Sequence, residues 1–326
     1  MKDFLFAINV LLPIIILIGL GYFIKKINLI SYEVFSAINK LCFHILLPIS
    51  LFVSIYKSSG IEEFNFTLLL FVAISLVVLF FIGLVIVKVF IKDDRQKGVI
   101  LQGIFRSNYA IIGIPLATAI GGEEATKVAA LVALVSIPIF NILGTIALTI
   151  FIKNEEKVSI SKILIRIIKN PLILGVLAGI VALLIRSLFE QIDFDFRLSQ
   201  IEFLYNAITS IGVIASPLAL ITLGGLFEFS NIKFMRKQIT FSVVARLIVL
   251  PFVVFSVTFL FFDFTSAEYA TLIALYASPI AVSSAVMAKE MDNDGDLANQ
   301  IVVWTTVCSS ITLFIIIFLF RIMEVF

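Results

Sequence analysis

Apolar residues in this chain are gathered into separate runs of about 20 residues, and no other feature restricts the possible folds as much. A helix of that length spans a hydrocarbon layer of roughly 30 Å. With 61% hydrophobic and 14% charged residues, the chain carries more apolar surface than a water-soluble domain of 326 residues buries. Because a backbone in lipid must satisfy its own hydrogen bonds, and runs of this length fit helices better than barrel strands, we expect an all-α polytopic membrane protein.

The charges and turn residues that end each apolar run predict about ten transmembrane helices. The connections between them are short, and no soluble domain fits anywhere in the chain. A nucleic-acid partner is not indicated, and the lipid bilayer is the expected surrounding. The predicted spans are roughly 4–24, 31–55, 66–91, 98–120, 126–152, 170–188, 203–227, 239–262, 268–289 and 298–321.

Lysine and arginine residues are divided unevenly between alternating loops. About fifteen lie in one set of loops and six in the other, and loops rich in these residues stay in the cytoplasm. The bias predicts a multi-pass protein of the bacterial cell (inner) membrane, with both termini outside the cytoplasm.

The prolines indicate an internal repeat with an offset of roughly 160 to 170 residues, about half of the chain. Two five-helix repeats would then occupy residues 1–152 and 170–326, joined by a basic cytoplasmic connection over 153–169. Because five is odd, the second repeat would be inverted in the membrane, as in many secondary transporters. The matched pairs are Pro13 with Pro171, Pro48 with Pro217 and Pro115 with Pro279, whereas Pro138 and Pro251 have no partner.

Polar residues and a proline interrupt both the fourth and the ninth span. Proline removes a backbone donor and disturbs the preceding turn, so we expect one half-helix to begin at Pro115 and another at Pro279, with Ser278 as the N-cap of the second. Their positive dipole ends would meet near the bilayer midplane and attract an anion. The alternative is that both prolines only kink packed helices. The candidate substrate-binding residues are Arg106, Asn108, Gly113, Pro115, Ser278, Pro279 and Ser283.

Acidic residues are absent from the middle third of every predicted span. This pattern disfavours a carboxylate proton relay and an acid-ligated sodium site. Arg106 either belongs to the site or snorkels to the headgroups, whereas Arg246 and the single histidine, His44, fit structural roles better. No metal or cofactor is expected, because the acidic loop 292–296 lacks the glycine and glutamate spacing of a calcium-binding loop.

These observations favour a secondary transporter of a small organic anion, a mono- or dicarboxylate, working by alternating access. A membrane sensor or a channel-like protein could be built from the same helices. A membrane-embedded enzyme is disfavoured, because no helical Asp-x-x-Asp pair and no histidine partner for a serine are visible.

Short motifs spread over essentially the whole chain resemble the auxin efflux carrier family. That family includes the plant PIN carriers and bacterial homologues described as malonate or other dicarboxylate permeases. The resemblance implies a fold like that of the bile acid:sodium symporters, with a scaffold domain, a transport domain, and fourth and ninth spans that cross at Asn108, Pro115 and Pro279. It also implies an elevator-type movement and a homodimer built on the scaffold. The motifs are Leu46-Leu47-Pro48, Asn108, Gly113-Ile114-Pro115-Leu116-Ala117, Ser216-Pro217-Leu218, Leu223-Gly224 and Ser278-Pro279.

Overall fold

The computed structural model describes residues 2–57, 65–152, 169–191, 197–229 and 235–326, and in these ranges it contains helices and no strand. Large apolar side chains such as Ile16, Phe81 and Leu260 are more than half exposed along the helices. Such an apolar outer surface is expected where lipid covers the protein. The prediction of an all-α polytopic membrane protein is therefore confirmed. The predicted connection 153–169 lies outside the described residues except at its last position.

The helices follow the apolar runs of the sequence. In chain order they are α1 (Lys2–Lys26), α2 (Tyr32–Leu41), η1 (Cys42–Leu46), α3 (Leu47–Tyr56), α4 (Phe66–Phe90), α5 (Asp94–Phe105), η3 (Tyr109–Gly113), α6 (Ile114–Thr149), α8 (Pro171–Gln191), η4 (Leu198–Gln200), α9 (Glu202–Gly225), α10 (Arg236–Val244), η5 (Ala245–Val249), α11 (Leu250–Phe261), α12 (Ser266–Tyr276), α13 (Ser283–Glu290) and α14 (Gly295–Ile322).

Eight helical stretches in the described residues are long and apolar enough to cross a membrane, two fewer than predicted. One of them, Asp94–Thr149, contains 56 residues, too many for one crossing at about 1.5 Å per residue. Within it, Gly122 has φ 65° and ψ −148°, a conformation open essentially to glycine alone, and the helix is kinked there. The ninth predicted span is also missing from the eight, because it consists of α12 and α13, which have 11 and 8 residues and are each too short to cross a membrane.

Three wider, π-helical turns come directly before a proline. The turns η1, η3 and η5 are followed by Leu47-Pro48, Ile114-Pro115 and Leu250-Pro251. A proline ring clashes with the carbonyl four residues earlier, and a wider turn relieves that clash. Pro115 therefore lies inside helical structure that begins at Tyr109, so the prediction that a half-helix begins at Pro115 is wrong.

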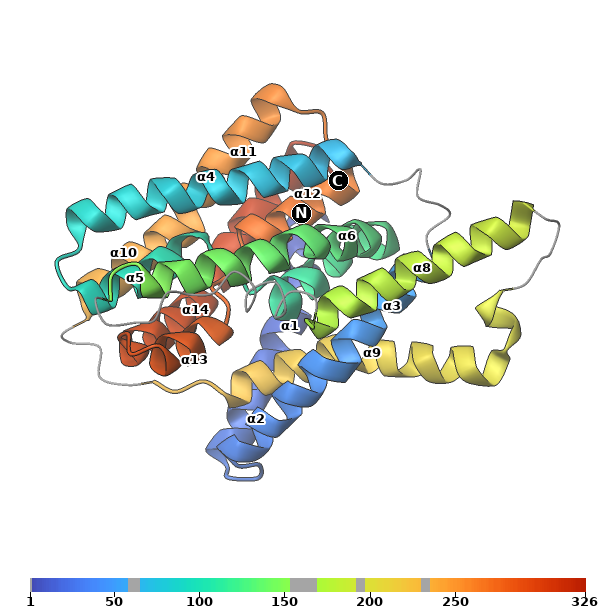
Figure 1. The fold of residues 1–326 in the computed structure, drawn as a ribbon, viewed down its shortest axis with the longest axis horizontal. Helices are drawn as coiled ribbons and strands as arrows, with labels where there is room; N and C mark the ends of the chain where they lie inside the picture. Colours follow the sequence, from blue (N-terminus) through green and yellow to red (C-terminus); the bar gives the residue numbers. More distant parts are fainter. Residues whose placement is uncertain (1, 58–64, 153–168, 192–196, 230–234) are drawn as a thin grey trace.

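The helices fall into two groups by their contacts. The first helix group consists of α1, α2, η1, α3, α8 and α9, in which α3 packs against α8 and α9, and α1 against α9. The second helix group consists of α4 to α6 and α10 to α14, in which α6 packs against α12 and α4, and α14 against α13 and α10. In Figure 1 the first group extends toward the lower right and the second occupies the upper left.

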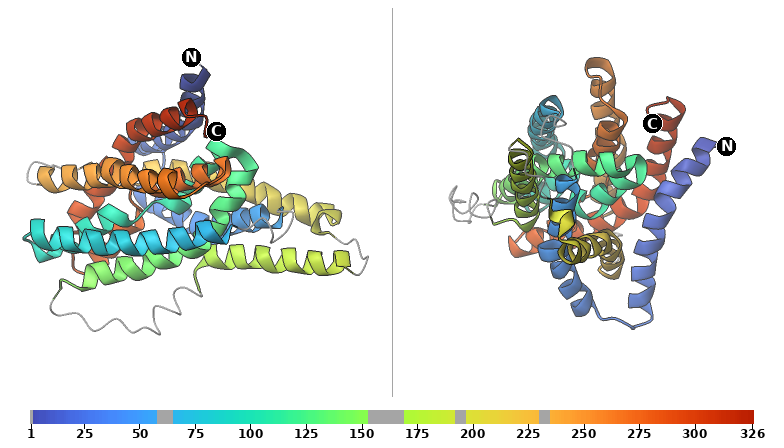
Figure 2. Two further views of the ribbon diagram at one scale, coloured as in Figure 1. Left: turned by 90° about the horizontal axis from the view of Figure 1, so that it is seen from above. Right: turned by 90° about the vertical axis from the view of Figure 1, so that its right-hand side faces the viewer.

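The two ends of the chain lie close together, beside the paired helices α1 and α14 (Figure 2). The Nε atom of Arg321, near the end of α14, lies 3.4 Å from Oδ1 of Asp3, near the start of α1. Both termini are thus at the same end of these two helices, as an even number of crossings requires.

Candidate functional site

The chain leaves helical geometry at two places that touch one another. Helix α5 ends at Phe105 and η3 begins at Tyr109, while α12 ends at Tyr276 and α13 begins at Ser283. The Asn108 N–H donates a hydrogen bond of 2.7 Å to the carbonyl of Pro279, which joins the two interruptions. Each interruption also leaves carbonyl and N–H groups that need partners in an apolar surrounding.

The second interruption extends further than the sequence predicted. Ser278 and Pro279 are both outside helices, and α13 begins four residues after the proline with Val282 as its N-cap. Their backbone carbonyls accept hydrogen bonds instead, that of Ser278 from Arg246 and that of Pro279 from Asn108. The prediction that Ser278 caps a helix beginning at Pro279 is therefore wrong.

Arg246 holds the carbonyl ends of α5 and α12. Its Nε donates to the Ser278 carbonyl at 2.8 Å, its Nη2 to Leu275 at 2.8 Å and its Nη1 to Phe105 at 3.2 Å. The side chain is fully buried, and its charge faces the negative dipole ends of two half-helices. Arg246 thus has a structural role, and it uses backbone oxygens that the sequence alone did not identify.

Arg106 is also buried, but its hydrogen-bond partners in the described part of the chain are neutral side chains. Nη1 donates to Gln102 Oε1 at 3.3 Å and to Met287 Sδ at 2.9 Å, and Nη2 donates to Asn141 Oδ1 at 3.3 Å and to Ser283 Oγ at 3.0 Å. The dipoles of these neutral groups compensate the positive charge of the Arg106 guanidinium only in part.

Arg106 comes directly after the last residue of α5. Asp93 caps that helix by accepting from the Arg95 N–H at 2.9 Å, so α5 starts at Asp94, four residues before the predicted span. Twelve helical residues then place Arg106 about 18 Å from the start of the helix. Arg106 is 4% exposed and its guanidinium bonds to four side chains inside the protein, so it does not extend toward the headgroups.

Gly144 of α6 makes room for the Arg106 guanidinium. A Cβ atom at this position would lie 2.8 Å from Nη1 of Arg106. The Gly144 carbonyl also accepts a hydrogen bond of 2.9 Å from Gln102 Nε2, whose own oxygen receives Arg106. Gln102 and Gly144 thus fix the arginine in its place.

Three buried polar atoms beside this arginine have no hydrogen-bond partner within the described residues. They are Nε of Arg106, Oγ of Ser107 and Nδ2 of Asn108. Unpaired buried polar groups cost free energy and often mark a place where another molecule supplies the partner. All three belong to residues that line one cavity.

That cavity, of about 390 Å³, lies between the two helix groups, a volume suited to a small organic molecule. No aspartate or glutamate is among its described lining residues. From the first helix group it is lined by Ser36, Asn39, Lys40, Phe43, His44 and Leu172, and from the second by residues 106–111, Ile137, Phe140, Asn141, 281–283, Val286 and Met287.

Of the seven predicted site residues, some line the cavity and the others lie at or beside the two helix interruptions. Arg106, Asn108 and Ser283 line the cavity, whereas the other four do not. Gly113 allows close packing instead, since a Cβ there would lie 2.8 Å from the carbonyl of Ala274. Pro115 is buried in the first turn of α6, and Ser278 and Pro279 provide the carbonyls described above.

The sequence reading missed the contribution of the first helix group to the cavity. Ser36, Lys40 and His44 are spaced four residues apart in the span 31–55, so they fall on one side of a helix. That polar stripe was the available signal. Only the packing of η1 and α2 opposite Arg106 turns it into part of a cavity wall.

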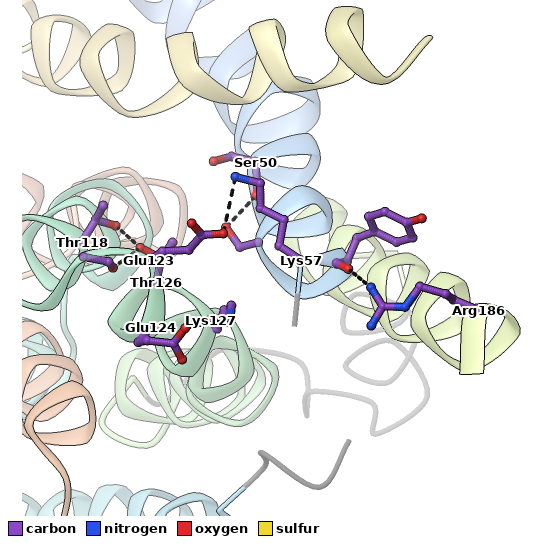
Figure 3. A network of polar contacts seen from close by, with 11 residues as sticks. Ser50, Lys57, Thr118, Glu123, Glu124, Thr126, Lys127 and Arg186 are labelled. Atoms are coloured by element: carbon purple, nitrogen blue, oxygen red, sulfur yellow. Dashed lines mark hydrogen bonds and ion pairs between the residues drawn. The ribbon is translucent and has the colours of Figure 1, made fainter. Parts of the chain in front are cut away.

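At the other end of the α2–α3 span, the two helix groups meet through charges (Figure 3). Lys57 Nζ lies 3.4 Å from Glu123 Oε1, which links the end of α3 to the residue after the Gly122 kink. The hydroxyls of Thr118 and Thr126 are 2.7 Å apart across that kink. Lys57 is 17 residues beyond Lys40, about 25 Å along a continuous helix. This ion pair thus adds to the packing of α1 against α14 and of α3 against α6 between the two groups, and the cavity lies nearer the start of the span.

Two comparisons show which known proteins this chain resembles. A family model described as membrane transport protein matches residues 6–317. An uncharacterized transporter of Methanocaldococcus jannaschii is 28% identical over 309 residues, which cover 91% of this chain and 94% of that protein.

Proposed function

Because this chain belongs to the family of membrane transport proteins that includes the auxin efflux carriers, we propose that it is a secondary transporter of a small organic anion, a mono- or dicarboxylate. The observation that carries this proposal is the buried guanidinium of Arg106, which among the described residues has neutral partners and lines a cavity without acidic side chains. A buried charge in a membrane needs a counter-charge, and a carboxylate in the cavity would provide one.

The helix N-termini beside the cavity also favour a negatively charged ligand. Asn108 is the N-cap of η3, and Ser283 is the first residue of α13, and both line the cavity with Arg106. Helix N-termini carry partial positive charge and free N–H groups. The anion would therefore lie between two helix starts and one arginine, while Arg246 compensates the opposite helix ends.

The position of the cavity between the two helix groups supports an alternating-access cycle of the elevator type. The second helix group carries Arg106, Asn108 and Ser283, and its movement against the first would carry the anion across the membrane. The Lys57–Glu123 ion pair would open in the opposite state. The interruptions in the fourth and ninth spans, one in each of the segments 1–152 and 170–326, are what an inverted repeat requires.

The proposed setting follows from the sequence. The count of lysine and arginine in the loops predicts that the cavity end of α2 faces the cytoplasm and that both termini lie outside it, in a bacterial cell membrane. The resemblance to the auxin efflux carriers implies a homodimer built on the scaffold domain, and we propose that the first helix group is this scaffold. A sensor or channel remains the second candidate, and the proposal includes no enzymatic activity.

Counterflow in proteoliposomes tests the proposal. Vesicles preloaded with one of acetate, malonate or succinate should accumulate the same labelled carboxylate transiently, which a sensor or a channel does not cause. Arg106→Gln should abolish accumulation, whereas the control Arg321→Gln, an exposed arginine paired with Asp3, should not. Counterflow of equal size in the Arg106→Gln protein would contradict the proposed site.

A further inference from the structure

We propose that His44 is a proton-binding residue of this cavity, and that its protonation and the binding of the organic anion favour one another. The inference rests on the proposed function of the cavity as an anion site. In this proposal, the proton is the second ligand, and its binding is coupled to that of the anion. His44 lies in η1 on the wall formed by the first helix group, and Arg106 lies on the wall formed by the second.

The hydrogen bonding of His44 determines which nitrogen takes the proton. Nδ1 lies 2.9 Å from the carbonyl oxygen of Lys40. A carbonyl only accepts, so Nδ1 carries its hydrogen in the neutral ring and Nε2 has the lone pair. No protein group in the described residues bonds to Nε2. A proton from water therefore binds at Nε2 and converts an acceptor into a charged N–H donor.

Protonation of Nε2 changes the interaction between His44 and a carboxylate in the cavity. The neutral ring presents a lone pair, which repels a carboxylate oxygen, whereas the imidazolium presents an N–H and a positive charge, which attract it. One proton is taken up at Nε2 when the anion binds and is released to water when the anion leaves. No covalent bond between heavy atoms changes.

The charges around His44 strengthen this coupling. Arg106 lines the same cavity from the opposite wall, and Lys40 lines it one turn before His44. A bound carboxylate compensates the charges of these two cations together with that of a protonated His44 ring. By linkage, the proton then increases anion affinity by the same factor as the anion increases proton affinity.

No other group in the described cavity wall takes up this proton. Histidine is the side chain that ordinarily changes charge between about pH 5 and pH 8, and no carboxyl side chain is among the described residues that line the cavity. The hydroxyl of Tyr109 is already committed to the Ala129 carbonyl at 2.9 Å. The other titratable groups on elements that pack near η1 are Tyr32, Glu33 and the buried Cys42 of the same span, Lys169 just before α8, Arg186 and Glu190 near the end of α8, Tyr56 of α3, and Glu202 and Tyr205 in the first turn of α9.

The first test measures anion affinity at pH 6.5 and pH 8.5, where acetate, malonate and succinate are largely ionised. The carboxylate that binds best should bind at least about threefold more tightly at the lower pH. The same measurement on His44→Gln corrects for ionisation of the carboxylate itself and should give nearly equal affinities. His44→Lys should bind with little dependence on pH, because its charge is permanent in this range. Equal pH dependence in the parent and in His44→Gln would overturn the proposal.

Two further readouts separate this inference from the proposed function. In weakly buffered solution at pH 7, adding the carboxylate should cause proton uptake by the parent and not by His44→Gln. Nitrogen-15 spectra of the single histidine, in protein purified without a histidine tag, should show hydrogen on Nδ1 at pH 8.5. Hydrogen on Nε2 instead would overturn the proton site even if carboxylates bind. Binding of no carboxylate at either pH would overturn the proposed function and this inference together.

Discussion

Two buried arginines, Arg246 and Arg106, lie beside the same pair of helix interruptions and differ in what surrounds them. Arg246 donates to three backbone carbonyls at the ends of α5 and α12. Arg106 meets amide, hydroxyl and thioether side chains and lines a cavity. A buried charge in a membrane protein is therefore not by itself a ligand site. The charge whose compensation is incomplete is the one available to a ligand.

The largest expected effect is loss of stability on removing Arg246. Arg246→Gln leaves carbonyls at Phe105, Leu275 and Ser278 without their charged donor, and buried unpaired carbonyls should reduce the free energy of unfolding by about 3–5 kcal/mol. Melting in detergent, followed by the loss of monodisperse protein, measures this. Arg321→Gln should melt close to the parent, and an Arg246→Gln protein that also does so would show that the two arginines do not differ as described.

The next effect is loss of affinity on removing Arg106 from a protein that still folds. In Arg106→Gln the neutral partners remain close to an amide, so the melting temperature should fall little. The charge-assisted contact to a carboxylate is lost, at about 2–3 kcal/mol, which corresponds to roughly thirty- to 150-fold weaker binding. Calorimetric titration measures the affinity. A large fall in melting temperature with unchanged affinity would instead place Arg106 in the same structural class as Arg246.

A smaller effect should follow from displacing Arg106 without changing it. In Gly144→Ala the new Cβ would lie 2.8 Å from Nη1, so the guanidinium must shift, and we expect about five- to tenfold weaker carboxylate binding, roughly 1–1.4 kcal/mol. Alanine otherwise favours a helix over glycine. The control is Gly19→Ala in α1, where nothing lies within 4 Å of the added atom. Binding that weakens equally in both variants would show that helix propensity, and not the arginine, is responsible.

The smallest effect concerns the ion pair at the other end of the α2–α3 span. The side chains of Lys57 and Glu123 are 38% and 57% exposed, and exposed pairs contribute about 0–1 kcal/mol. Lys57→Glu or Glu123→Lys alone should change the transport rate by less than about fivefold. The double swap should restore the rate if the pair stabilises one state of the cycle. A double swap as impaired as the single variants would remove this contact from the account.

The fold class was predictable because the length of an apolar run is a local property, whereas the ends of the half-helices were not. The helix α5 ends at Phe105, and its carbonyl is held by Arg246, which is 141 residues away in the chain. Pro115 gave only an indirect signal of this, because its ring widens the turn before it and does not begin a helix. Long-range partners of this kind cannot be read from a single segment.

The lining of the candidate site was predictable where one segment supplies it and not where the two helix groups meet. Arg106 and Asn108 were identified because polar residues near a proline are conspicuous in an apolar span. Lys40 and His44 lie more than 60 residues earlier, and they become part of the cavity wall only when η1 and α2 pack opposite α5 and α13. Gly144 and Gln102 could not be connected with Arg106 without its side-chain position.

An electron cryomicroscopy structure with the best-binding carboxylate would show directly whether a carboxylate compensates Arg106 between the two helix groups. We expect ligand density within hydrogen-bond distance of the Arg106 guanidinium and the Ser283 hydroxyl, with Arg246 still bonded to its three carbonyls. Density elsewhere, such as the groove lined by Tyr22, Phe229 and Thr306, with the Arg106 cavity unoccupied, would contradict it.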